Sequence, residues 1–224
     1  MRALVLTPRF VQALLALLLL GAAGAVPADT VPVPIVGPGD YPLGGITAAS
    51  DPALAGPIIY DVMQPFNFGP SVTGDVQVRV VRETGTGTLD FYWRVIDDAN
   101  SGGDITALRV AGFGTTPLAA DFRTDGLGTV GPDIARAFGG ASTGDVNFLF
   151  DTPVRPGESS NFFFLSTPAT SFAPNGLYDL LCAPLNCVSG TFTTQVPGVP
   201  EPATLALLGL GILGSEFLRR RRRR

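Results

Sequence analysis

Oxygen-bearing side chains between residues 97 and 104 form the part of the chain best suited to binding a cation. Asp98, Asn100 and Asp104 follow one another in a short glycine-containing stretch, and carboxylate and amide oxygens are ligands that Ca²⁺ accepts. The bidentate glutamate that ends an EF-hand loop is missing, and the same residue types are common in turns between strands. The stretch therefore fits a calcium site or a plain turn, and we expect no obligatory cofactor or metal.

Two pairs of carboxylates could support acid–base chemistry. A glycosidase needs only two acids, and Asp90 with Asp97 or Asp145 with Asp151 lie at or near the ends of expected strands. Nothing in the sequence distinguishes them from solvated loop acids. The chain has no histidine, which excludes Ser-His and Cys-His nucleophile pairs and the common histidine–zinc sites. We therefore expect no enzymatic activity and no catalytic residue, with an acid-pair glycosidase as the alternative.

The two cysteines of the chain, Cys182 and Cys187, enclose four residues. A closely spaced pair in an exported protein is typical of a disulfide. The C-x-x-C spacing of redox motifs is absent, and no histidine is present to complete a zinc site. Because so short a loop removes little chain entropy, we expect a local clip that stabilises the fold by about 1–2 kcal/mol.

Short β-strands are the elements that must position these residues, since apolar and polar residues alternate along much of the chain. Residues 75–83 and 88–97 flank a Thr-Gly-Thr-Gly turn and predict a hairpin with an aromatic core face. Residues 146–150 and 161–166 predict a second hairpin-like pair, and a short turn of helix is expected at Asp133 to Phe138. The remaining strands are expected near residues 58–62, 105–113, 118–124, 177–181 and 188–195.

This pattern of many short strands, without an amphipathic helical stretch, predicts an all-β fold. We expect an antiparallel β-sandwich, jelly-roll-like or immunoglobulin-like, at residues 58–195. The immunoglobulin-like form fits less well because cysteines five positions apart cannot bridge two sheets in the usual way. A Pro/Gly-rich extended lead-in at residues 26–57 precedes the sandwich, and a stem at residues 196–199 follows it.

Six aromatic residues of the expected strands are predicted to form the core rather than a carbohydrate-binding platform. They are Phe91, Tyr92, Trp93, Phe162, Phe163 and Phe164. Tyr92 is opposite in parity to Phe91 and Trp93, so we expect it to face solvent. Phe163 alternates with its two neighbours, so one side of its strand must be covered. The alternative is a glycan-binding or calcium-dependent adhesin module that uses exposed aromatics or the stretch from residue 97 to 104.

The N-terminus has the features of a cleavable secretory signal peptide at residues 1–25, which we expect to form a helix. Arg2 and Arg9 supply positive charge, an apolar run follows from Phe10 to Leu20, and small residues come next. Cleavage is expected after Ala25 or Ala28, and a retained N-terminal anchor is the alternative. Between the termini, residues 26–199 carry seven arginines and 17 acidic residues, a net charge of −10, which argues against nucleic acid as a partner.

The C-terminal residues 200–224 consist of three parts in a fixed order. Pro200, Glu201 and Pro202 form a stiff acidic tripeptide that stays extended. Residues 203–218 form an apolar segment that predicts a single transmembrane helix of about 24 Å, shorter than the roughly 30 Å of a bilayer core. Six arginines at the end are expected to stop transfer at the cytoplasmic side: Arg219, Arg220, Arg221, Arg222, Arg223 and Arg224. An ordinary single-pass anchor is the alternative.

The order of these parts resembles the PEP-CTERM sorting signal of Gram-negative bacteria that make extracellular polysaccharide. The departures are Ser215 and Glu216 near the end of the apolar segment and an arginine run longer than usual. The resemblance implies that an exosortase-like membrane protease recognises and processes the tail. It also implies an inner-membrane-anchored precursor that becomes a cell-surface or extracellular protein, linked to exopolysaccharide and biofilm.

Overall fold

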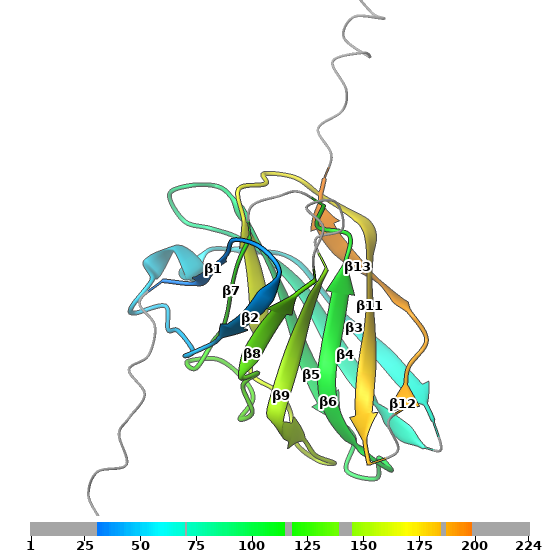
Figure 1. Cartoon of the computed structure of the whole chain (residues 1–224). Helices are drawn as coiled ribbons and strands as arrows, with labels where there is room; N and C mark the ends of the chain where they lie inside the picture. The colour runs from blue at the N-terminus through cyan, green and yellow to red at the C-terminus, as the bar shows by residue number, and fades with distance from the viewer. Residues whose placement is uncertain (1–30, 70, 115–117, 139–144, 185–186, 199–224) are drawn as a thin grey trace, which may run out of the picture.

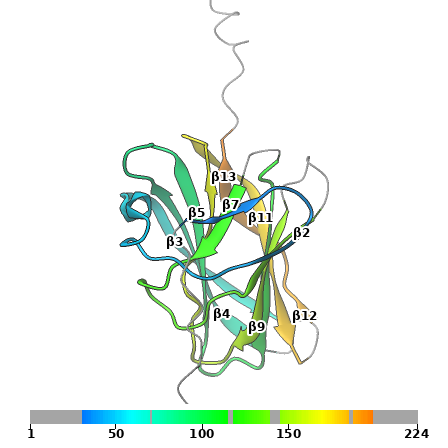
Figure 2. The same cartoon turned by 60° about the vertical axis from the view of Figure 1, so that its left-hand side comes forward.

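The computed structural model describes residues 31–69, 71–114, 118–138, 145–184 and 187–198. These residues form two antiparallel β-sheets packed face to face (Figures 1 and 2), which confirms the expected all-β architecture. They contain one 3₁₀ turn, η1 (Pro52–Ala55), but no helix long and apolar enough to cross a membrane. The helices expected at residues 1–25 and 203–218 lie outside the described residues.

Sheet A has six strands and contains the hairpin predicted from the sequence. In spatial order its strands are β1 (Val33–Ile35), β7 (Leu118–Phe122), β10 (Phe163–Thr167), β5 (Leu89–Asp97), β4 (Val72–Arg82) and β3 (Ile58–Phe68). The predicted hairpin is the β4–β5 pair, whose register sets Val78 opposite Trp93. Gly85 and Gly87 in its turn have φ values of 97° and 74°, a conformation that glycine adopts without a Cβ clash.

Sheet B has seven strands and closes the other side of the sandwich. Six follow one another in space: β12 (Cys187–Val188), β11 (Phe172–Ala183), β6 (Asp104–Ala111), β9 (Val146–Val154), β8 (Ile134–Ala137) and β2 (Gly39–Pro42). The seventh, β13 (Phe192–Pro197), pairs with β11. The neighbours β8–β9, β7–β10 and β6–β11 form nested pairs, so the chain from residue 104 to 183 folds back on itself across both sheets.

Three local expectations differ from the structure. The turn of helix expected at residues 133–138 is wrong, because Ile134–Ala137 is strand β8, paired with β2 and β9. The second hairpin is also wrong: β9 and β10 lie in different sheets. Within the expected lead-in, the described residues 31–57 contribute β1 to sheet A and β2 to sheet B. These strands have only three and four residues, too few for a period to be visible in the sequence.

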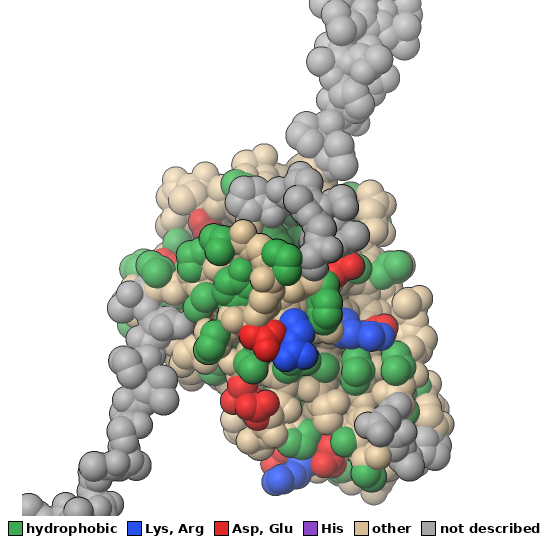
Figure 3. Space-filling model, viewed as in Figure 1, with side chains coloured by type: hydrophobic (Ala, Val, Ile, Leu, Met, Phe, Trp, Pro, Cys, Tyr) green, Lys and Arg blue, Asp and Glu red, His purple; other side chains and the backbone are tan. Residues whose placement is uncertain are grey.

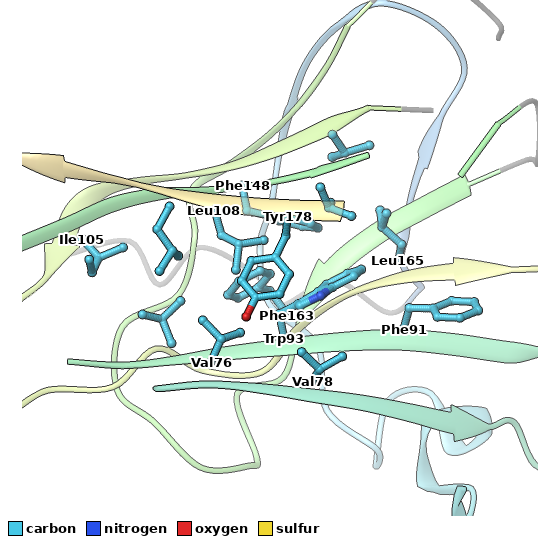
Figure 4. Packing of buried hydrophobic residues seen from close by; sticks show 14 of the residues in the cluster. Val76, Val78, Phe91, Trp93, Ile105, Leu108, Phe148, Phe163, Leu165 and Tyr178 are labelled. Carbon is cyan, nitrogen blue, oxygen red and sulfur yellow. The ribbon is translucent and has the colours of Figure 1, made fainter. Parts of the chain in front are cut away.

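The main core lies between the sheets and is built from alternate residues of each strand. Figure 4 shows its centre, where Trp93 of β5 meets side chains from both sheets. The Trp93 ring centroid lies 6.3 Å from that of Phe163 in sheet A and 6.2 Å from that of Phe148 in sheet B. Its indole nitrogen donates a hydrogen bond to Thr194 Oγ1 of β13 at 3.0 Å. The core therefore carries a satisfied polar link between the sheets.

A smaller apolar cluster lies on the outer face of sheet A. The residues of this outer cluster are Ile46, Leu54, Val81, Tyr92, Phe162 and Phe164. Ile46 and Leu54 come from the lead-in, which runs across this face and carries η1. The sequence predicted that one side of the strand at Phe163 is covered. The lead-in provides this cover. Sheet A therefore carries a buried apolar cluster on each face, whereas the outer face of sheet B has no such cluster among the described residues.

Candidate functional site

The predicted sorting residues Pro200, Glu201, Pro202 and Arg219 to Arg224 lie outside the described residues, as does the signal peptide. The chain that leads to them is firmly bound. Val196 is 3% exposed, and Pro197 is the last residue of β13. The backbone N–H of Gly198 donates to the Ser171 carbonyl at 2.8 Å. Of the expected stem at residues 196–199, Val196 and Pro197 belong to β13 and Gly198 is bonded next to it, two residues before the sorting tripeptide.

Cys182 and Cys187 form the predicted disulfide, with their Cα atoms 5.1 Å apart. They are direct partners in the β11–β12 register, so the bond closes a tight connection at one edge of sheet B. Both cysteines belong to the same sheet, unlike the pair that joins the two sheets of an immunoglobulin domain.

The calcium candidates stand in a turn between β5 and β6. Asp98 and Asn100 are exposed, and Asp104 is the first residue of β6. The Asp98 carbonyl accepts a hydrogen bond from the Ser101 N–H at 2.9 Å, as in an ordinary turn. Among the described residues, no three acidic, cysteine or histidine side chains converge as metal ligands. Calcium binding by this turn stays a prediction.

The carboxylate pairs expected from the sequence are not brought together. Asp90 and Asp97 lie in one strand, seven residues and roughly 23 Å apart, on opposite faces of sheet A. Asp145 and Asp151 are separated by roughly 20 Å along β9. An inverting or retaining glycosidase needs its two carboxyl groups within about 10 Å.

A different carboxyl pair, Glu83 and Asp90, does come together on the outer side of sheet A. Asp90 is fully buried, and burial together with the negative charge of Glu83 raises its pKa to about 8. Burial also acts to raise the pKa of Glu83, but hydrogen bonds from Thr86, Thr88 and Ser166 outweigh it and lower that pKa. The sequence did not predict this pair. Ser166, which donates a hydrogen bond to Glu83, is far from it in the chain and reaches it only through strand pairing.

All six aromatic candidates are buried, so the core interpretation is confirmed for them. The expectation that Tyr92 faces solvent is wrong: it is 3% exposed. Tyr92 does lie on the opposite face of β5 from Phe91, as its parity predicts, and points away from the main core. The outer side of β5 is not solvent, however, because Leu54 and the rest of the outer cluster cover it.

The outer face of sheet B carries a row of polar side chains across five strands. Direct register partners share a face of a sheet, and those in the row are Asp40, Arg136, Asn147, Arg109 and Asp179. Arg136 binds Asp40 through two nitrogens, at 2.6 and 2.7 Å, and Arg109 binds Asp179 in the same bidentate way. In Figure 3, acidic and basic side chains lie side by side across this face, with apolar side chains around them.

A pocket of about 350 Å³ adjoins this row. Phe138, half exposed, and Leu177 give it apolar walls, and Arg109, Asn147 and Asp179 line its polar side. The side-chain amide of Asn147 also lines the pocket, and an amide can both donate and accept hydrogen bonds. Sequence reasoning missed this row because its members come from strands up to 139 positions apart, Asp40 to Asp179.

Comparison with known protein families finds the PEP-CTERM protein-sorting motif at residues 198–223. This match confirms the resemblance seen in the sequence. It begins at Gly198, the residue bound to Ser171, and includes Pro200 to Pro202, the apolar segment and five of the six arginines. The motif implies an exported chain that an exosortase-like membrane protease processes. No curated protein matches the chain.

Proposed function

We propose that this PEP-CTERM chain is a non-enzymatic passenger protein, a stable β-sandwich delivered to the bacterial cell surface or the extracellular matrix. The observation that carries the proposal is that the sorting motif starts where β13 ends, with Gly198 bound to the sheet and Pro200 two residues on. A folded domain joined this closely to its tail leaves the tail as the extended segment that a protease can bind. The extended strands of the sandwich are less accessible, because they are paired with one another.

Each part of the tail has a separate role in this proposal. The protease recognises Pro200, Glu201 and Pro202, which proline keeps extended. Residues 203–218 hold this segment at the membrane, and Arg219 to Arg224 keep the end of the chain on the cytoplasmic side. Residues 26–199 have a net charge of −10, whereas the end of the chain is strongly basic. After processing, the sandwich supports exopolysaccharide or biofilm outside the cell.

Mass spectrometry of the protein in the producing cell tests the sorting step. Extracellular material should lack residues after the cleavage site, whereas Glu201→Ala should accumulate as a cell-associated chain that retains Arg224. Glu158→Ala, which removes an acid from an exposed turn of the sandwich, is the matched control and should be processed normally. Extracellular protein that still ends in Arg224 would rule the proposal out.

Glycan binding is a second candidate function, and the polar row of sheet B favours it. Its two ion pairs cancel in charge, which suits a neutral ligand, and the Asn147 amide beside the half-exposed Phe138 offers both hydrogen bonding and an apolar surface. A glycan array should show binding that Asn147→Ala and Phe138→Ala both weaken. Binding that neither change affects, or no binding, would leave the row as surface ion pairing alone.

Calcium dependence of such an adhesin is a separate proposal, and the turn at Asp98, Asn100 and Asp104 would supply the ligands. Added Ca²⁺ should raise the melting temperature of the protein, and Asp98→Ala should abolish the increase. The absence of any shift in the unsubstituted protein would exclude a calcium site of this kind.

A further inference from the structure

Three arginines gather on the outer face of sheet A around the ring of Phe162. The guanidinium carbon of Arg79 lies 4.3 Å from the ring centroid and that of Arg94 lies 5.7 Å from it. Arg123 directly follows β7, and its backbone N–H donates to the Phe162 carbonyl at 2.7 Å. Two guanidinium groups therefore share one aromatic ring, and the backbone of a third arginine is bonded to the same phenylalanine.

These cations outnumber the carboxylates that reach them. Arg79 binds Asp61 at 2.8 Å, and Arg123 binds Asp125 at 2.6 Å. Arg94 has only a hydrogen bond of 3.4 Å to the Gln77 side-chain oxygen. Burial lowers the pKa of Arg94, and the positive charge of Arg79 lowers it further. In a domain with far more acids than arginines, this local excess of positive charge requires an explanation.

Three hydrogen-bond donors in this cluster are buried and have no acceptor in the part of the chain that the structure describes. They are Arg79 Nε, Arg94 Nε and the Tyr92 hydroxyl. A buried donor without a partner costs about 1–3 kcal/mol, so three of them within one cluster are unusual in a native protein. Burial raises the pKa of Tyr92 beyond its ordinary value, which keeps the hydroxyl protonated and able to donate.

A pocket of about 230 Å³ opens at the same place. Arg79, Arg123 and Tyr92 provide its polar wall, and Phe162 also lines it. Its other walls are mainly apolar and come from the lead-in, from β3 and β4, and from the loop after β7: Leu54, Ala55, Ile58, Val81 and Leu127. This volume lies just below the range of pockets for drug-sized ligands, so the pocket suits a smaller molecule.

We propose that this pocket binds a small organic acid, with one carboxylate on a compact apolar body. The carboxylate accepts hydrogen bonds from Arg79 and Tyr92, and the charge of Arg94 stabilises it from beside the pocket. The apolar body packs on Phe162, Leu54 and Leu127. Inorganic sulfate or phosphate would leave these apolar walls empty, and a larger polymer would not fit the volume. The site goes beyond the sorting function, which makes no use of this face.

Benzoate and its neutral counterpart benzamide are suitable probes because they differ in charge but hardly in shape. Calorimetry on the full chain in detergent should show benzoate binding at least tenfold more tightly than benzamide. Tyr92→Phe keeps the ring and should weaken benzoate binding about five- to tenfold, the equivalent of one hydrogen bond. The same change should leave the melting temperature of the ligand-free protein equal or higher, because it removes an unsatisfied buried hydroxyl.

Arg94→Gln should weaken benzoate binding severalfold. Its matched control is Arg136→Gln, which makes the same change in net charge on the opposite sheet and should not alter binding. Three outcomes would overturn the proposal: equal affinity for benzoate and benzamide, equal weakening by the two arginine changes, or no benzoate binding by a correctly folded protein. Processing of the tail is measured separately, so failure here leaves the sorting function untouched.

Discussion

The arginines on the two outer faces of the sandwich have different surroundings. On sheet B, Arg109 and Arg136 each bind one aspartate through two nitrogens, and water reaches both pairs. On sheet A, the lead-in covers Phe162 and Tyr92, and Arg79 and Arg94 keep buried nitrogens without acceptors. Exposed ion pairs contribute little to stability, whereas unsatisfied buried groups cost a good deal. A ligand bound at the covered face would therefore contribute more to stability than one bound at the face of sheet B.

The cover itself accounts for the difference. Residues 43 to 56 cross sheet A and add Ile46 and Leu54 to its outer cluster. The Gly45 N–H donates to Asp121 Oδ1 at 3.0 Å, and the Ile46 N–H donates to the Phe122 carbonyl at 2.8 Å, so the segment is bonded to β7. Sheet B has only β2 at one edge and no segment across its centre among the described residues.

The largest effect should come from removing the apolar contacts under the cover. Phe164→Ala deletes a fully buried ring of the outer cluster and should lower the free energy of unfolding by about 3–5 kcal/mol. Leu149→Ala, at a half-buried position on the outer face of sheet B, should lower it by only about 1 kcal/mol. Denaturant unfolding measures both, and equal losses would mean that the lead-in contributes no real packing.

The next effect is a pH dependence of stability that is expected for the outer face of sheet A and not for that of sheet B. Asp90 has a folded-state pKa of about 8 against about 4 when unfolded, so the folded state favours its neutral form. The stability that this gives is complete below pH 4 and is lost as the pH rises through 8. Asp90→Asn should therefore reduce the loss of stability between pH 5 and pH 9 by about 4 kcal/mol. Asp151→Asn, at an exposed site of sheet B, should leave the pH profile unchanged.

A smaller effect is expected at the disulfide, which lies at the edge of sheet B. Replacing Cys182 and Cys187 by alanine should lower the free energy of unfolding by about 1–2 kcal/mol, because the closed loop is short. Benzoate affinity should stay the same, since the pocket lies over the other sheet. Weaker benzoate binding in the variant with both cysteines replaced would contradict the independence of the two faces.

The smallest effect should distinguish the arginines by their partners. Arg109→Gln breaks a bidentate, partly exposed ion pair and should lower the free energy of unfolding by about 1 kcal/mol or less, with the difference shrinking at high salt. Arg94→Gln removes a cation that lies beside another cation and should be neutral or slightly stabilising without ligand. A substantial loss of stability for Arg94→Gln would show that a protein group already satisfies this guanidinium.

The sequence predicted the parts of the fold that depend on local pattern. The β4–β5 hairpin follows from alternation around a glycine turn, and the disulfide follows from the spacing of Cys182 and Cys187. The sorting motif is equally local, since its parts are consecutive in the chain. Each of these features can be read from residues that stay neighbours after folding.

Features made by distant residues were missed for the same reason. Tyr92 is buried because Leu54 reaches over it, and no residue near Tyr92 indicates this. Strand β8 is four residues long, so no alternation could mark it, and its pairing with β2 depends on the lead-in. The arginine cluster likewise arises when β4, β5 and the ends of β7 and β10 meet, which sets Arg79, Arg94 and Arg123 around Phe162.

The short strands of the lead-in have a consequence for how copies of this protein meet one another. They form one edge of each sheet, and each contains a proline, Pro34 in β1 and Pro42 in β2. At the opposite side, Pro65 lies in the long edge strand β3, whose Gln64 is bound to the Thr193 carbonyl of β13. Short, proline-containing edges resist the strand-to-strand pairing that turns β-proteins into fibres. Such edges therefore disfavour the joining of sheets from neighbouring copies of the protein.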